Sequence, residues 1–231
     1  MTSPLALSEN ARIACDDFGR EGLRLVTVDD ALRDVETVRA IAARHDYRPI
    51  GPHYPGIRAA VSERVAMPLV QPLLPLMQQV FALARPPSYR ECYLSLVTRA
   101  PADLAPIQRL PHFDGVEATR IAVLLYLDPQ GRGGTGFFRQ RETGFEYVDG
   151  ERLPSYEEAL RRGVAEHGMP PARFIGADSA LFERTLEVED RLNRMVLYRG
   201  NTLHCAALRD DFLPDADPST GRLSLNLFLQ A

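Results

Sequence analysis

Short apolar segments separated by Gly, Pro and Asp fill the chain from Arg90 onward. Their content of apolar and β-branched residues is typical of strands. These segments are 92–98, 121–127, 135–139, 193–198 and 222–229. The last one alternates, with Arg222, Ser224 and Asn226 on one face and leucines on the other. A strand with a polar inner face predicts a barrel with a wet pocket.

Helical spacing dominates the first eighty-odd residues. Apolar residues recur every three to four positions over 31–44, where Asp29 or Asp30 can cap the helix. A second helix is expected near 73–84. The apolar run 67–84 is interrupted by three prolines and three glutamines, so it predicts a buried, kinked helix and not a membrane span.

The segment 144–176 interrupts the strands. It contains SYEEALRRGVAEHG, in which Ser155 and Glu158 have the spacing of a capping box, so we expect a helical insertion. Helices first, then antiparallel strands with one excursion, indicate the α+β class. We expect a single domain over 1–231, with a mainly helical support over 1–88 and a β core over 89–231.

Composition and net charge limit the classes of partner that are expected. A chain of 231 residues with 45% apolar and 25% charged residues is typical of a globular protein. The net charge of −4 provides no basic stripe, so nucleic acid is not expected as a partner. The N-terminus has no secretory pattern, which favours the cytoplasm without membrane contact. The three cysteines are odd in number and too far apart for a zinc knuckle, so we expect reduced thiols at Cys15, Cys92 and Cys205.

Candidate metal ligands occur in PHFDG, residues 111–115. His112 and Asp114 are two apart, so in an extended chain their side chains point to one side, roughly 7 Å apart. The best candidate for a third ligand is His204 in YRGNTLHCA. Two His and one carboxylate leave one face of the ion open for co-substrate and dioxygen, which suits iron(II). The alternative is a chance His-x-Asp pair beside a structural histidine.

Polar residues near these ligands suggest a carboxylate anchor. Arg222 and Ser224 lie on the same face of the last strand, and an arginine fork with a hydroxyl can bind a terminal carboxylate. Tyr126, on the strand after the His-Asp pair, is placed to reach the same carboxylate. The alternatives are a surface arginine at a strand start and a half-buried tyrosine in a β core.

The order of these motifs resembles the 2-oxoglutarate-dependent oxygenase superfamily: His112-Phe113-Asp114, then His204, then Arg222-Leu223-Ser224. Tyr126-Leu127-Asp128 followed by Gly133-Gly134-Thr135 is similar to its prolyl-hydroxylase-like branch. YPGIRA at 54–59, GGTGFFR and YRGNTLHCA also look like a bacterial family of uncharacterised oxygenase-like proteins.

The resemblance implies a double-stranded β-helix (jelly roll or cupin-like) with N-terminal helices packed on the sheet. It implies Fe(II) as the metal and 2-oxoglutarate as co-substrate. It makes His112, Asp114 and His204 the catalytic metal ligands. The co-substrate would be bound by Arg222, Ser224 and Tyr126.

Two spacings are long for that superfamily. Asp114 to His204 is 204 − 114 = 90 residues, and His204 to Arg222 is 222 − 204 = 18. The helical insertion explains the first and the loop DDFLPDADPSTG the second. We expect both to lie at the mouth of the barrel as lids, the alternative being surface decoration. Resembling enzymes that halogenate have a small residue in place of the carboxylate, so Asp114 favours hydroxylation.

The function expected is therefore a dioxygenase that hydroxylates a small molecule, such as an amino acid or a natural-product intermediate. The alternatives are a catalytically inactive jelly-roll binding protein and a metal-dependent barrel enzyme that does not use 2-oxoglutarate. Five further polar residues could line the substrate side or support the ligands, each with a structural explanation too: Tyr54, Arg58, Gln108, Arg120 and Asn201. Three histidines lack partners at ligand spacing and are expected to be solvated or capping: His45, His53 and His167.

Overall fold

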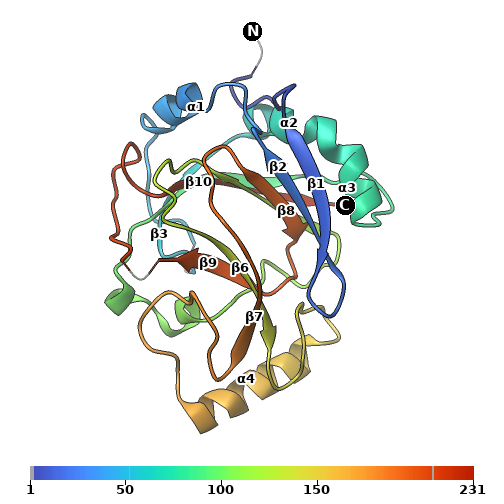
Figure 1. Cartoon of the computed structure of the whole chain (residues 1–231), viewed down its shortest axis with the longest axis vertical. Helices are drawn as coiled ribbons and strands as arrows, with labels where there is room; N and C mark the ends of the chain where they lie inside the picture. Colours follow the sequence, from blue (N-terminus) through green and yellow to red (C-terminus); the bar gives the residue numbers. More distant parts are fainter. Residues whose placement is uncertain (1–2, 52, 210) are drawn as a thin grey trace.

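Two antiparallel sheets face each other in the computed structural model, which describes residues 3–51, 53–209 and 211–231 (Figure 1). The seven-stranded sheet has the order β1-β2-β8-β5-β10-β4-β3, and the three-stranded sheet has the order β7-β6-β9. The strands are β1 Arg12–Phe18, β2 Leu23–Asp29, β3 Gly56–Ala60, β4 Ser88–Val97, β5 Arg120–Tyr126, β6 Gly133–Gln140, β7 Phe182–Val188, β8 Met195–Arg199, β9 His204–Leu208 and β10 Leu223–Gln230.

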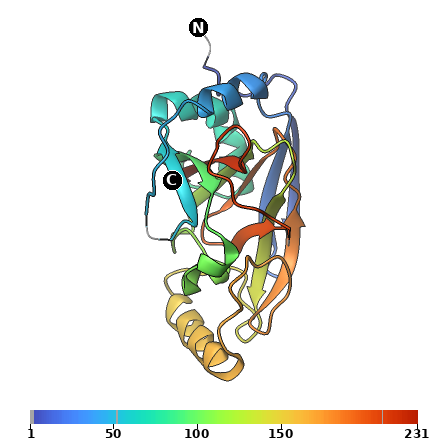
Figure 2. The ribbon, with the colours of Figure 1, turned by 90° about the vertical axis from the view of Figure 1, so that its left-hand side faces the viewer.

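Helices gather at the two ends of the molecule (Figure 2). At one end lie α1 Val35–Ala42, α2 Glu63–Val70 and α3 Leu74–Val80, with the short 3-10 helix η1 Gln71–Leu73 between the last two. At the other end lies α4 Leu153–His167. No helix within the described ranges is long and apolar enough to cross a bilayer.

The outer face of the larger sheet carries the main core. Apolar side chains of β2, β4, β5 and β10 pack there against α2 and α3, including Leu94, Val123, Leu225, Leu69 and Met77. This is the leucine face that alternation predicted for β10. Its opposite face, with Ser224 and Asn226, lines a cavity between the sheets. The predicted polar inner face of β10 is therefore confirmed.

The region 1–88 contains the predicted helices but also three strands that were not expected. β1, β2 and β3 extend the larger sheet, and β1 is an edge strand paired with β2 alone. Every β1 residue before Phe18 is exposed, so burial imposes no alternation that would reveal a strand. The helix over 31–44 is shorter than expected and begins at Val35, because Asp34 is the cap and accepts the N–H of Thr37.

Prolines set the other helix boundaries. The predicted kinked helix over 67–84 is present as α2, η1 and α3, with a proline in each. The helical insertion is also present as α4, but Ser155 does not cap it. The helix begins at Leu153 with Pro154 in its first turn, a position that proline favours, and Asp149 accepts the N–H of Arg152.

Candidate metal centre

A pair of backbone hydrogen bonds brings the two candidate histidines together. The N–H of His112 donates to the carbonyl of His204, and the reverse bond is also made, both at 2.8 Å. Such a pair places residues directly opposite each other on antiparallel strands. The segment 110–114 thus runs alongside β9, and the two imidazole centroids lie 4.4 Å apart. The N–H of Asp114 is fixed by the carbonyl of Gly200 at 2.7 Å.

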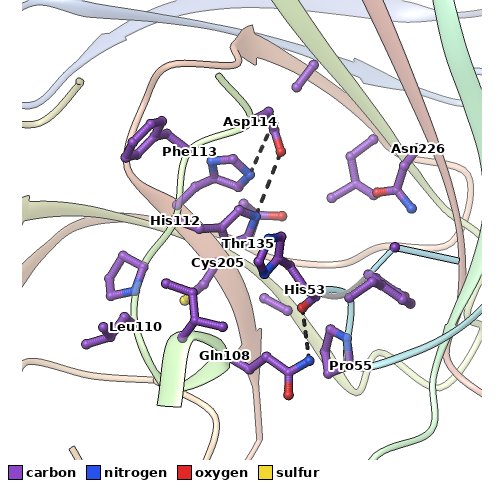
Figure 3. A pocket seen from close by; sticks show the side chains of 18 of the residues that line it. His53, Pro55, Gln108, Leu110, His112, Phe113, Asp114, Thr135, Cys205 and Asn226 are labelled. Atoms are coloured by element: carbon purple, nitrogen blue, oxygen red, sulfur yellow. Dashed lines mark hydrogen bonds and ion pairs between the residues drawn. The ribbon is translucent and has the colours of Figure 1, made fainter. Parts of the chain in front are cut away.

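The three predicted ligands converge on one point. One ligand atom from each of His112, Asp114 and His204 lies within 4.8 Å of the others. Nε2 of His112 is 3.9 Å from Oδ1 of Asp114 (Figure 3). Nε2 of His204 is 3.6 Å from Oδ2 of Asp114. Distances of this size leave room for an ion between the side chains, whereas direct hydrogen bonds would not.

The donor set fits a metal ion. Oδ2 of Asp114 is buried and has no hydrogen-bond partner among the described residues, although a buried carboxylate oxygen normally has one. Nδ1 of His204 lies 2.9 Å from the carbonyl of Thr202, an arrangement that directs Nε2 toward the ion. A cation at the centre would satisfy the unpaired oxygen.

The electrostatic environment favours the neutral, metal-binding form of His112 but disfavours the ionised, metal-binding form of Asp114. Burial raises the pKa of Asp114, an effect partly offset by His204 and Arg120. Desolvation within the cavity and the coulombic effect of neighbouring His204 lower the pKa of His112 well below its ordinary value. His112 therefore keeps its lone pair free at neutral pH.

A cavity of about 630 Å³ contains the three side chains together with the predicted carboxylate anchor. Arg222 is 5% exposed, and its Nε and Nη2 donate to the carbonyl of Gly133 at 2.9 and 2.6 Å. Within the described ranges no hydrogen bond uses its Nη1. The Ser224 hydroxyl accepts from Asn226 at 3.3 Å. The volume is within the range of roughly 300–1,000 Å³ seen for small-molecule sites.

Tyr126 does not line this cavity, which corrects the prediction that it reaches the co-substrate. Its side chain is 1% exposed and its hydroxyl is 2.7 Å from that of Thr135. The Tyr126 ring packs between the two sheets with Phe137 and Tyr198, so the alternative of a buried core tyrosine holds. Thr135 itself does line the cavity.

The five weaker candidates also divide into residues that line the cavity and one that does not. Tyr54, Arg58, Gln108 and Arg120 line the cavity, whereas Asn201 is buried behind it. Gln108 donates to the carbonyl of His53 at 3.0 Å (Figure 3).

Glu91 also lines the cavity, although it was not among the predicted site residues. The alternation of Glu91, Tyr93 and Ser95 along β4 is the signal that could have found it. The predicted thiols are confirmed as free cysteines, and Cys205 lies on the cavity wall with its pKa raised to about 12 by burial.

The two insertions have different positions. Leu153, Tyr156 and Leu160 of α4, with Phe174 and Ile175 after it, form one wall of the cavity. The first insertion therefore contributes to the cavity wall, and its role as a lid stays a prediction. The described residues of the loop 210–221 do not line the cavity, so its role as a second lid stays a prediction. Phe212 of that loop packs edge-on against Phe174, with centroids 5.8 Å apart.

The model of a family of unknown function, DUF6445, matches residues 9–229, and the chain belongs to that family. No curated protein matches it. Among solved structures, HygX from Streptomyces hygroscopicus with nickel and 2-oxoglutarate bound is similar at 14% identity and a TM-score of 0.49, over 89% of this chain and 82% of its own.

Two further solved structures are similar at the same low level. One is SnoN, the non-heme alpha ketoglutarate dependent epimerase from nogalamycin biosynthesis, at 18% identity and a TM-score of 0.46, over 89% of this chain and 78% of its own. The other is AviO1 from Streptomyces viridochromogenes Tue57, at 12% identity and a TM-score of 0.46, over 94% of this chain and 90% of its own.

Proposed function

We propose that this member of the DUF6445 family is an Fe(II)- and 2-oxoglutarate-dependent dioxygenase that acts on a small molecule. One observation carries the proposal: His112, Asp114 and His204 converge around an unpaired carboxylate oxygen in the cavity that Arg222 lines. Two imidazoles and one carboxylate on one side of an ion are the ligand set of non-haem iron oxygenases.

The strand order supports a double-stranded β-helix, the architecture that the proposal requires. From β4 to β10 the chain passes between two four-membered layers. One layer has the order β4-β10-β5-β8, and the other consists of the segment 110–114 followed by β9-β6-β7. Each layer combines strands from the first half and from the second half of the region between β4 and β10. The two halves of this region therefore wind around one another. The cavity lies inside the winding.

The protein's residues would have separate tasks in this reaction. His112, Asp114 and His204 would hold the iron, which when bound supplies oxygen activation. Arg222 and Ser224 would bind the far carboxylate of 2-oxoglutarate. A carboxylate ligand at Asp114 leaves no room for a halide, which favours hydroxylation. The apolar wall from α4 would keep water from the reacting carbon.

The test is an anaerobic titration of the purified protein with Fe(II) and 2-oxoglutarate. A visible absorption band from the metal–2-oxoglutarate chelate is expected, with succinate formed once dioxygen and a substrate are added. Metal binding without the band would indicate a metal enzyme that does not use 2-oxoglutarate. Neither metal binding nor the band would indicate a binding protein and contradict the proposal.

Arg222→Gln is expected to weaken 2-oxoglutarate binding about 10- to 150-fold, because charge-assisted hydrogen bonds are worth ~1.5–3 kcal/mol. The measurement is the 2-oxoglutarate concentration that half-saturates the chelate band. The control is Arg191→Gln, which removes an exposed arginine paired with Glu189 and should leave the band unchanged. Equal affinity in wild type and Arg222→Gln would remove Arg222 from the site.

A further inference from the structure

Arg58 of β3 is a second arginine on the cavity wall, and the metal centre does not use it. Its guanidinium carbon lies 4.0 Å from the ring centroid of Tyr54 and 5.1 Å from that of Tyr93. Two aromatic rings therefore hold the planar group in place. A guanidinium fixed in this way loses little freedom when it binds a ligand, which favours recognition of a specific group.

The charge of Arg58 has no carboxylate partner among the described residues. Its Nε is buried without a hydrogen bond, and within the described ranges no carboxylate forms an ion pair with its side chain. The other cavity arginines differ, because Arg120 contacts Glu117 at 3.3 Å and Arg222 donates to Gly133. Leaving a partly buried charge unpaired is costly, and an anion from outside would offset that cost.

Glu91, an acid on the same wall, does not neutralise Arg58. Its Oε2 accepts the hydroxyl of Tyr93 at 2.8 Å. The Tyr93 side chain thus contacts Glu91 through its hydroxyl and Arg58 through its ring face. The guanidinium donors of Arg58 remain available to the cavity.

Arg58 lines the same cavity as His112, Asp114 and His204. A small molecule bound at Arg58 would therefore extend toward the ligand cluster. The rest of the wall offers an apolar surface to the body of such a molecule, formed by Ile107, Leu110, Phe113, Leu153 and Leu160.

We propose that Arg58 binds an oxyanion of the substrate, a carboxylate or a phosphate, and that the substrate is an anionic small molecule with an apolar body. The proposal rests on the proposed function, and it names the substrate class of the same cavity. A guanidinium fork presents two parallel N–H groups that match two oxygens of such a group. Arg222 serves the co-substrate in the proposed function, so the two arginines would bind different groups.

The experiment measures ligand-induced thermal stabilisation, which does not depend on turnover. Wild type is held without oxygen, both alone and with Fe(II) and 2-oxoglutarate. It is screened against small carboxylates and phosphates beside amides, alcohols and amines of the same carbon skeletons. The compounds that raise Tm are expected to be oxyanions, and comparing carboxylates with phosphates identifies the group. Stabilisation by neutral or cationic members, or by none, would overturn the proposal.

Variants then assign the site. Arg58→Gln should weaken binding of the stabilising oxyanion at least tenfold, and Arg58→Lys should weaken it less because the charge is kept. Arg48→Gln is the matched control, since Arg48 pairs with Arg58 through the backbone and its side chain is exposed. Circular dichroism checks that each variant is folded. Unchanged oxyanion affinity in folded Arg58→Gln would contradict the proposal.

The two proposals fail in different ways. In Arg58→Gln the chelate band should form at the wild-type 2-oxoglutarate concentration, whereas in Arg222→Gln it should not. Loss of the band in Arg58→Gln alone would assign the co-substrate to Arg58 and overturn this inference while leaving the oxygenase intact. An Arg58-dependent oxyanion site without any band would overturn the proposed function and retain the anion site.

Discussion

Asp114→Ala is expected to lower the affinity for Fe(II) by more than about a hundredfold, since outer-shell partners alone are worth roughly 10- to 100-fold. Asp114 supplies the only carboxylate in the ligand cluster that the described residues form. Without it, two imidazoles 4.4 Å apart face the cavity with no negative charge to balance a divalent cation. Anaerobic calorimetry with Fe(II) measures the loss, and His112→Ala should act likewise.

Removing the charge of Asp114 should stabilise the metal-free protein, although it lowers the affinity for Fe(II). Burial raises the pKa of Asp114, so the folded protein holds this proton more tightly than the unfolded chain does. Above the ordinary pKa of a carboxyl group, the ionised side chain therefore destabilises the fold, increasingly as pH rises through the raised pKa. Asp114→Asn removes the charge but keeps the shape, and the metal-free variant should melt at a higher temperature than wild type at neutral pH.

A lower affinity for Fe(II) together with a higher melting temperature distinguishes a metal ligand from a structural residue. A structural aspartate would lose stability on substitution and leave Fe(II) affinity intact. Asp103→Ala is the control, because Asp103 is exposed at the end of the 3-10 helix Pro101–Asp103 and its substitution is expected to change neither quantity. Full retention of Fe(II) binding in Asp114→Ala would refute the metal assignment.

Local patterns predicted the core strands because burial imposes alternation on them. The leucines of β10 pack under the helices while Ser224 and Asn226 face the cavity, so one strand revealed both the core and the wet interior. β1 could not be found in this way, since nearly all of its side chains are exposed and its place depends on pairing with β2. Its sequence carries no trace of that pairing.

The candidate site shows the same limit. The His-x-Asp spacing predicted two ligands from strand geometry alone. That residue 112 lies opposite residue 204 follows from a backbone pairing across a long stretch of chain, which no local pattern encodes. Tyr126 was assigned from its face of the strand, but the face did not reveal that Phe137 and Thr135 would cover it. Alternation predicts the face of the sheet to which a side chain points, whereas the exposure of that side chain depends on the residues of the opposite sheet.

Near the candidate metal centre, a buried cluster of charges supports the segment that carries His204. Nη2 of Arg139 donates to Oε1 of Glu146 at 2.5 Å, and Glu146 is 0% exposed. The Glu146 carboxylate also accepts the backbone N–H groups of Arg20 and Glu21, at 2.9 and 3.0 Å. The carbonyl of Glu146 in turn accepts the N–H of Leu203, the residue before His204.

Arg139→Met is therefore expected to lower the free energy of unfolding by ~3–5 kcal/mol, because it leaves Glu146 buried without its cation. Urea unfolding measures the change. Arg141→Met is the matched control: its pair with Asp178 is largely exposed and should be worth no more than about 1 kcal/mol.

The double variant Arg139→Met with Glu146→Gln tests the cause. Removing both charges leaves no fully buried ion without a partner, since Glu183, the other partner of Arg139, is partly exposed. The loss of stability in the double variant should therefore be smaller than the sum of the two single losses. Additive losses would mean that Arg139 acts through packing instead of charge. Because Glu146 positions Leu203, Arg139→Met should also weaken Fe(II) binding while Arg141→Met does not, which would tie the metal centre to a charge pair outside its cavity.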